Sequence, residues 1–130
     1  ATDVTGFGLL GHLTEMVSQS CVTAEVYVDC VPVFDDVLDF VKMEMISGAV
    51  ERNREYAARC VSKDAQVSAE WESVLYDPQT SGGLLMAVKE EKKEETLLRL
   101  KEKGVEHAEV IGKVVAESDG RIILKKCPNS

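Results

Sequence analysis

Several features that would assign this chain to a well-marked class of proteins are missing. None of the four cysteines belongs to a Cys-x-x-Cys pair, and neither histidine lies near a cysteine in the sequence, so the spacing of a zinc site is absent. The longest unbroken apolar run, Leu84–Val88, is far too short to span a membrane. No signal peptide or basic targeting segment is visible either. We therefore expect no membrane partner.

Basic residues are scarce relative to acidic ones. The chain has 15 Lys and Arg against 23 Asp and Glu, which gives a formal net charge of −8. Such a chain lacks the broad positive surface that nucleic-acid binding needs, so we expect no nucleic-acid partner. Small molecules that contain phosphate remain compatible with this charge, because a few local donors or a bound metal ion can hold them.

What the chain does have is the composition of an ordinary globular domain. It contains 130 residues, 45% of them hydrophobic, which is enough to bury one core without disulfides. We predict a single domain over residues 1–130. The cysteines at positions 21, 30, 60 and 127 are expected to be unpaired thiols, as in a reducing cytoplasm.

The apolar residues recur with helical and strand periods in irregular alternation. Apolar residues at helical spacing predict helices over residues 8–20, 34–46, 49–60 and 90–103, and a further short helix from Ser68, its expected N-cap. Gly104 is expected to close the helix before it. Residues 62–67 are expected to be loop. The predicted strands cover residues 22–30, 84–88 (buried), 110–115 and 122–124, the last two as a hairpin-like pair.

This order of elements lacks the strand–helix–strand rhythm of a doubly wound parallel sheet. The predicted fold class is therefore α+β, with helices packed on a mixed or antiparallel sheet.

A glycine-rich loop precedes the first predicted helix. In Thr2–Gly8, Gly6 and Gly8 permit backbone conformations and close approaches that a Cβ would block. The helix that follows directs its free amides toward the loop, which suits an anion, and the carboxylate of Asp3 suits a divalent cation between itself and phosphate oxygens. The alternative is that Asp3 or Thr5 caps the helix and the glycines form a turn. The spacing alone does not decide between the two.

A second glycine-rich loop, Asp77–Gly83, lies between a predicted helix and a predicted strand. Pro78 restricts Asp77 to an extended backbone. The hydroxyls of Thr80 and Ser81 could face a ligand or satisfy loop amides, and the two glycines that follow let the chain turn back into the core. Taken alone, this loop is more typical of structure than of function.

Two other features have a simple structural interpretation. His12 falls between apolar positions of the first helix, so we interpret it as hydrogen-bonded or partly exposed rather than catalytic. The polar segment Arg52–Tyr56 could line a site but is more typical of a helix surface.

Four segments taken together are more specific than any one of them. The segments are ATDVTGFGLLGHL at residues 1–13, RNREY at 52–56, DPQTSGGLL at 77–85 and VIGKV at 110–114. In this order and with this spacing they resemble selenophosphate synthetase (selenide, water dikinase), over nearly the whole chain. The stretch DVTGFG alone is shared loosely with relatives such as aminoimidazole ribonucleotide (AIR) synthetase and thiamine-monophosphate kinase.

The resemblance implies a PurM-like C-terminal domain of a two-domain enzyme that converts selenide, ATP and water into selenophosphate, AMP and phosphate with Mg²⁺. Asp3 matches the family aspartate that helps to hold the metal ions bridging the ATP phosphates. Thr5, Gly6 and Gly8 match the loop around that aspartate. A family signature of unassigned role is matched by Asp77, Thr80, Ser81, Gly82 and Gly83.

The resemblance also implies what lies elsewhere. The family's reactive cysteine or selenocysteine, its partner lysine, most nucleotide contacts and the homodimer interface belong to an N-terminal part that these residues do not include. We therefore expect a cytoplasmic enzyme whose isolated C-terminal domain is inactive. The alternatives are another ATP-dependent enzyme of the AIR synthetase or thiamine-monophosphate kinase type, and a non-catalytic binding domain that keeps the fold.

Overall fold

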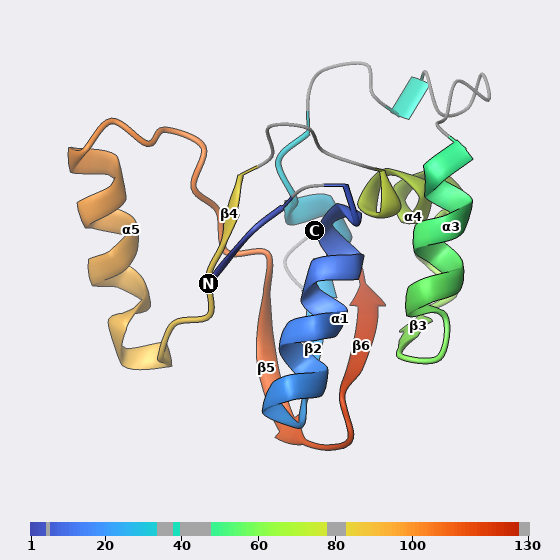
Figure 1. Ribbon diagram of the computed structural model, residues 1–130. Coiled ribbons are helices and arrows are strands. Elements are labelled where there is room, and N and C mark those ends of the chain that lie inside the picture. The colour runs from blue at the N-terminus through green and yellow to red at the C-terminus, as the bar shows by residue number, and fades with distance from the viewer. Residues whose placement is uncertain (5, 34–37, 40–47, 78–82, 128–130) are drawn as a thin grey trace.

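The computed structural model describes residues 1–4, 6–33, 38–39, 48–77 and 83–127. Its main layer is a four-stranded sheet with the strand order β3-β6-β2-β5 (Figure 1). These strands are β2 (Val22–Tyr27), β3 (Val61–Lys63), β5 (Gly112–Glu117) and β6 (Arg121–Lys125). β6 runs parallel to both β2 and β3, whereas β5 runs antiparallel to β2. The predicted α+β class with a mixed sheet is thus confirmed.

The pairing of the last two strands was predicted wrongly. β5 and β6 do not form a hairpin-like pair, because β2 lies between them and bonds to both. The connection at Ser118–Gly120 instead crosses the junction of α1 and β2, where the Ser118 amide donates to the Cys21 carbonyl at 2.9 Å. Gly120 has φ +98° there, and a Cβ on it would stand 2.8 Å from the Ser18 Cα. The turn at Asp119 and Gly120 therefore joins strands that are next-nearest neighbours in the sheet.

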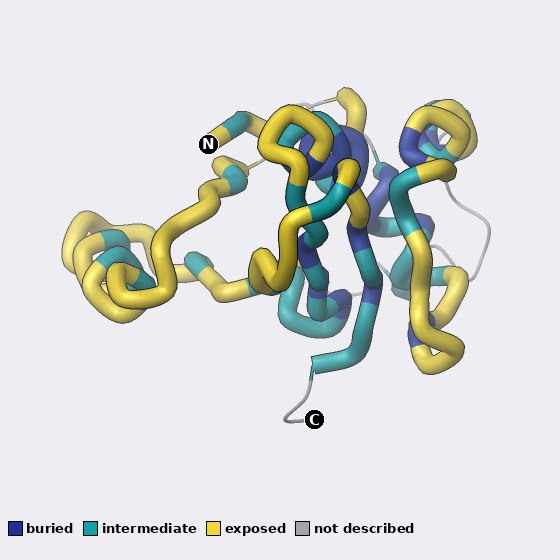
Figure 2. Tube along the Cα trace, turned by 90° about the horizontal axis from the view of Figure 1, so that it is seen from below, coloured by how far each residue is buried: buried dark blue, intermediate teal, exposed yellow. Residues whose placement is uncertain are grey.

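Helix α1 (Gly8–Ser20) packs on this sheet and has the predicted bounds. Its buried apolar residues are Leu10, Leu13 and Val17. They meet Ala24 and Val26 of β2, together with Ile122 and Leu124 of β6, in one core. Figure 2 shows the buried segments gathered where α1 lies against the central strands. The strand predicted over residues 22–30 ends at Tyr27, and a 3₁₀ turn, η1 (Val28–Cys30), follows it.

Two further helices complete the core beside α1. Helix α3 (Gly48–Ala57) and helix α4 (Ala69–Tyr76) both contact α1 and each other. The predicted N-cap is confirmed, because the Ser68 hydroxyl accepts from the Trp71 amide at 3.3 Å. The prediction of a loop at residues 62–67 is wrong for its first two residues, which belong to β3. β3 pairs in parallel with the edge of β6, and its single apolar residue leaves no periodic signal.

A second, two-stranded sheet joins the chain start to the segment after the second loop. Its strands are β1 (Thr2–Asp3) and β4 (Leu84–Leu85), which are antiparallel. The prediction of a buried strand over residues 84–88 is wrong in length and in burial. Only Leu84–Leu85 is strand, Leu84 is 59% exposed, and both Met86 and Val88 are exposed.

The helix predicted over residues 90–103 is divided into a 3₁₀ turn, η2 (Glu90–Lys92), and α5 (Lys93–Glu102). Gly104 closes it with φ +90°, as predicted. The Gly104 amide bonds the Lys101 carbonyl and the Val105 amide bonds the Leu100 carbonyl, the two bonds of a Schellman motif. α5 stands apart from the four-stranded sheet and has no buried residue (Figures 1 and 2).

Most of the helix predicted over residues 34–46 lies outside the described residues. Among the described residues, no helix combines the length and the apolar character needed to cross a membrane.

Candidate functional site

The described residues of the two glycine-rich loops, which are far apart in the sequence, lie next to each other in the structure. β1 and β4 place Thr2 opposite Leu85 and Asp3 opposite Leu84. The Val4 amide continues this ladder by donating to the Gly83 carbonyl at 2.9 Å. The start of the first loop is therefore bonded to the end of the second, and the exposed Asp3 lies next to both.

Gly8 makes a second contact between the loops. It has φ +74°, and a Cβ at this position would lie 2.8 Å from the Tyr76 carbonyl oxygen and 3.1 Å from the Asp77 carbonyl oxygen. A side chain there would collide with backbone atoms that cannot move aside cheaply. The expectation that a glycine permits a close approach is thus met at Gly8. It is not met at Gly6 or Gly83, where an added Cβ would have open space and φ is not in the left-handed region.

Asn53 of α3 links the first loop to the end of α4, the helix that leads into the second loop. Its side chain is 6% exposed, and its Nδ2 donates to the Gly6 carbonyl at 3.0 Å and to the Tyr76 carbonyl at 2.8 Å. Both N–H groups of the amide are thereby used. One side chain holds the backbone of the first loop and the last residue of α4, just before Asp77.

The sequence pattern alone does not single out Asn53, because RNREY reads as a solvated helix face. A signal was nevertheless available. The buried residues of α3 are Val50, Asn53 and Ala57, so the asparagine occupies the i+3 position of an apolar stripe. A polar residue on a buried stripe must find hydrogen-bond partners there, since an unpaired buried amide is costly.

The end of α4 is held by a charged cluster from three elements. Arg54 of α3 donates to the Ser73 hydroxyl at 3.2 Å and lies 5.5 Å over the ring centre of Tyr76. Glu72 pairs with Lys63 of β3 at 2.7 Å. Burial, followed by the nearby Glu72 carboxylate, raises the pKa of Tyr76 to about 12 although the Arg54 guanidinium acts in the opposite direction. Tyr76 is therefore a neutral, fully packed anchor for the second loop.

Asp77 follows this anchor and is half-buried. Burial raises the pKa of its carboxyl group, because removal from water disfavours the charged form. Thr5, Thr80, Ser81 and Gly82 of the predicted site lie outside the described residues.

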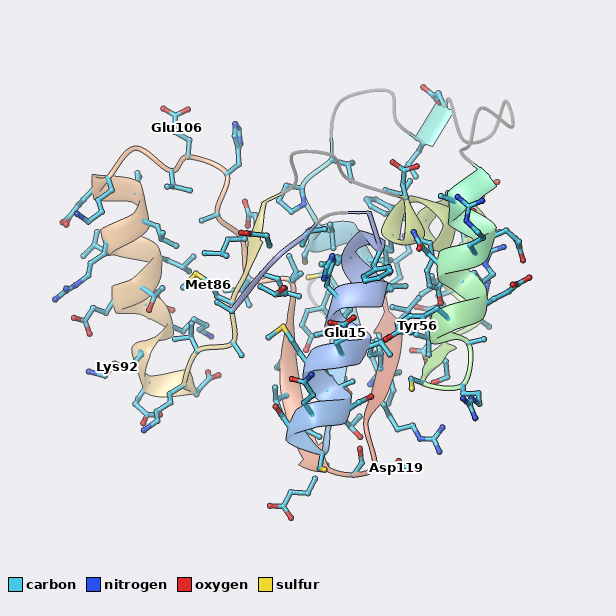
Figure 3. The ribbon with its side chains drawn as sticks, viewed as in Figure 1. Glu15, Tyr56, Met86, Lys92, Glu106 and Asp119 are labelled. Carbon is cyan, nitrogen blue, oxygen red and sulfur yellow. The ribbon has the colours of Figure 1, made fainter. Side chains whose placement is uncertain are left out.

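A shallow pocket of about 330 Å³ opens beside the first loop. Phe7 stacks on Tyr56 at its edge, with ring centres 5.8 Å apart and 14° between the planes. Both rings remain about half exposed, at 49% and 55%. Figure 3 shows Tyr56 directed from α3 toward α1. The pocket is lined by Gly6, Phe7, Ala49, Arg52 and Asn53.

His12 is buried behind this pocket, not partly exposed, and its ring lies 5.5 Å from that of Phe7. This contact gives the histidine a packing role under the first loop. The α1 N-cap is Phe7, whose side chain cannot accept a hydrogen bond, and Asp3 is not the cap. The alternative that Asp3 caps the first helix is therefore wrong.

The chemistry of Asp3 suits a magnesium site, but the number of metal-binding side chains described around it does not. Its exposed carboxylate is the hard oxygen donor that Mg²⁺ takes. Within the part of the chain that the structure describes, however, no group of three or more His, Cys, Asp or Glu residues could hold a metal ion. The described residues therefore form no complete metal site around Asp3.

Comparison with known proteins identifies the family to which this chain is similar. The family described as "AIR synthase related protein, C-terminal domain" matches residues 1–125. Proteins named "Selenide, water dikinase" are 43% identical over 124 residues in Clostridium botulinum (strain Alaska E43 / Type E3), 40% over 126 in Carboxydothermus hydrogenoformans and 39% over 124 in Escherichia coli O139:H28. These matches cover 95%, 97% and 95% of this chain, but only 36%, 36% and 35% of the relatives.

Proposed function

The chain belongs to the family of AIR synthase related proteins, C-terminal domain, and from that premise we propose that it is the C-terminal domain of a selenide, water dikinase. The intact enzyme converts selenide, ATP and water into selenophosphate, AMP and phosphate. The chain spans about a third of the length of the relatives it matches, so the rest of the active site belongs to the remaining two thirds.

One observation supports this proposal above the others. The two glycine-rich motifs of the resemblance meet at one place, through the β1–β4 ladder, the Gly8 contact with Tyr76 and the two hydrogen bonds of Asn53. If these loops served only as turns, they would not need to contact each other. Their convergence next to Asp3 is what a shared phosphate and metal site requires.

Each part of this site has a distinct task. Asp3 supplies one carboxylate ligand, and the ladder to Leu84 holds its backbone. Gly6, held by Asn53, and the N-terminal amides of α1 face an anion. Mg²⁺, when bound, would neutralise charge on the ATP phosphates and orient them for attack. Phosphoryl transfer depends chiefly on such positioning, so the rigidity of the joined loops serves the reaction.

The remaining components lie outside this chain. ATP and selenide are the partners of the intact enzyme, which we place in the cytoplasm as a homodimer formed through the N-terminal part. The cysteines of this chain have no role in selenium handling in this proposal.

The test is an assay of AMP release by the intact protein that contains this chain. We expect AMP formation from ATP to require selenide, with selenophosphate detected by ³¹P NMR. AMP release or phosphoryl transfer that depends on an amide or a phosphate ester instead would favour the AIR synthetase or thiamine-monophosphate kinase type. Absence of any turnover, with binding of a ligand retained, would favour a non-catalytic domain and overturn the proposal.

A further inference from the structure

Two of the four cysteines, far apart in the sequence, lie against each other. β2 and β6 are parallel, and their register places Tyr27 opposite Lys125. The pairing ends there, and η1 follows β2. Beyond the ladder, the Cys127 amide donates to the Asp29 carboxylate at 2.7 Å, which holds the segment after β6 against η1. Cys30 follows Asp29, and its thiol is hydrogen-bonded to that of Cys127.

The surroundings of this pair distinguish it from the other two cysteines. Cys30 and Cys127 are both half-buried, and neither forms a disulfide. Cys21 is exposed, and its Sγ contacts the Ser18 carbonyl at 3.8 Å. Cys60 is half-buried at the end of the α3–β3 turn. Only the first pair thus combines mutual contact with two separate anchors, η1 on one side and the end of β6 on the other.

We propose that Cys30 and Cys127 form a reversible intramolecular disulfide when the protein meets a low-molecular-weight disulfide such as oxidised glutathione. The site is independent of the proposed function, because neither residue belongs to the glycine-rich loops. It would be a modification site that links the segment after β6 to η1 by a covalent bond.

The exchange proceeds in two balanced steps. The Cys127 thiolate attacks one sulfur of oxidised glutathione, which releases one reduced glutathione and leaves a mixed disulfide. Cys30 then loses its proton and attacks the Cys127 sulfur, which releases the second glutathione. The two protein thiols are oxidised, and the two sulfurs of glutathione disulfide are reduced.

This order follows from the environment of Cys30. Burial, the hydrogen bond with Cys127 and the carboxylates of Asp29 and Glu109 raise the pKa of Cys30 to about 11. Cys30 therefore keeps its proton near neutral pH and is a poor first nucleophile, since the thiolate is the reactive form. Its contact with Cys127 makes it the resolving thiol.

The bond would act on a segment that supports the candidate site. η1, which ends at Cys30, packs against α4, and α4 carries Tyr76 and leads into Asp77. Joining η1 to the residue that follows β6 would restrict the movement of η1 and so reinforce the support of the second loop.

The experiment treats the fully reduced 130-residue chain, under native conditions, with excess oxidised glutathione. We expect the number of titratable thiols to fall from four to two, the intact mass to fall by about 2 Da for the two hydrogens lost, and peptide mapping to find one linked pair, Cys30 with Cys127. Addition of dithiothreitol should restore all four thiols.

Single variants separate this pairing from general thiol oxidation. Cys30→Ser should stop at a glutathione adduct on Cys127, whereas Cys21→Ser and Cys60→Ser should still form the linked pair. Mapping of the unsubstituted chain decides the matter even if a variant fails to fold. Four remaining thiols, a different pairing, or adducts without an intramolecular bond would overturn the proposal.

Discussion

The side-chain amide of Asn53 donates to the backbone carbonyl of Tyr76 at 2.8 Å, inside a core that is otherwise apolar on this face of α3. The same nitrogen reaches the Gly6 carbonyl at 3.0 Å. A buried asparagine with both N–H groups used joins the first loop to the last residue of α4, just before the second loop. One side chain from a third element therefore adds to the backbone contacts that hold the loops together.

Replacing this joint should destabilise the fold. In Asn53→Ala two carbonyls lose their donor, and buried unpaired groups of this kind cost about 1–3 kcal/mol. We expect the free energy of unfolding in urea to fall by that amount with an unchanged m-value. Arg52→Ala, at the exposed neighbouring position, is the matched control and should change stability by less than about 0.5 kcal/mol. Equal effects of the two substitutions would show that the Asn53 hydrogen bonds contribute nothing.

The glycines of the two loops should respond differently to the same substitution. Gly8→Ala combines φ +74° with a contact of 2.8 Å to the Tyr76 carbonyl oxygen, so we expect a loss of about 2 kcal/mol or more. Gly83→Ala adds a methyl group to open space at an ordinary φ and should stay within about 0.5 kcal/mol. Thermal unfolding of the two variants gives the comparison. A Gly8→Ala variant as stable as Gly83→Ala would contradict the close approach at Gly8.

Much of the local structure was predictable, because its signals are local. The bounds of α1 follow from the apolar period of its sequence. The N-cap role of Ser68 follows from its hydroxyl, and the helix-ending role of Gly104 follows from the left-handed backbone that a glycine allows after a helix. Strand pairing was not predictable in this way. The insertion of β2 between β5 and β6 depends on contacts between distant parts of the chain, which the turn at Ser118–Gly120 does not encode.

The same limit applies to the candidate site. The sequence motifs identify Asp3, Gly8 and Asp77 as members of glycine-rich loops, yet nothing in either loop indicates that Gly8 touches Tyr76. Asn53 joins the loops from a segment that reads as a solvated helix. The partners of Asn53 are backbone carbonyls of distant segments, which no local pattern can indicate. The only sign of its role in the sequence is its position on a buried stripe of the helix.

Stability at high pH should depend on Tyr76. Its pKa is raised from 10.0 to about 12 in the folded chain, so the unfolded chain loses the proton first as the pH rises. This contribution is complete below about pH 10 and is lost as the pH approaches about 12, in total about 2–3 kcal/mol. The difference in unfolding free energy between the unsubstituted chain and Tyr76→Phe should shift by this amount over that range. Tyr56→Phe, which alters an exposed ring and keeps Tyr76, is the control and should retain the pH dependence of the unsubstituted chain.

The isolated chain should bind ATP weakly in the presence of Mg²⁺. Asp3 is one carboxylate, and the described residues offer no group of three metal-binding side chains around it. Titration calorimetry should therefore give no dissociation constant below about 1 mM, which corresponds to only about 4 kcal/mol of binding. Micromolar binding to these 130 residues alone would contradict a site divided between this chain and the rest of the enzyme.

The metal-ligand role of Asp3 is tested most directly in the intact protein. Asp3 is exposed and lies outside the core, so Asp3→Asn should change the free energy of unfolding by less than about 0.5 kcal/mol. The rate of selenide-dependent AMP release should nevertheless fall by about 100-fold or more, because a neutral amide replaces a charged ligand where phosphate charge must be balanced. Glu106→Gln, on the segment after α5 (Figure 3), removes a carboxylate away from the loops and should keep full activity. A large loss of stability with activity retained in Asp3→Asn would exclude the metal-ligand role, since the carboxylate would then serve the fold and not the reaction.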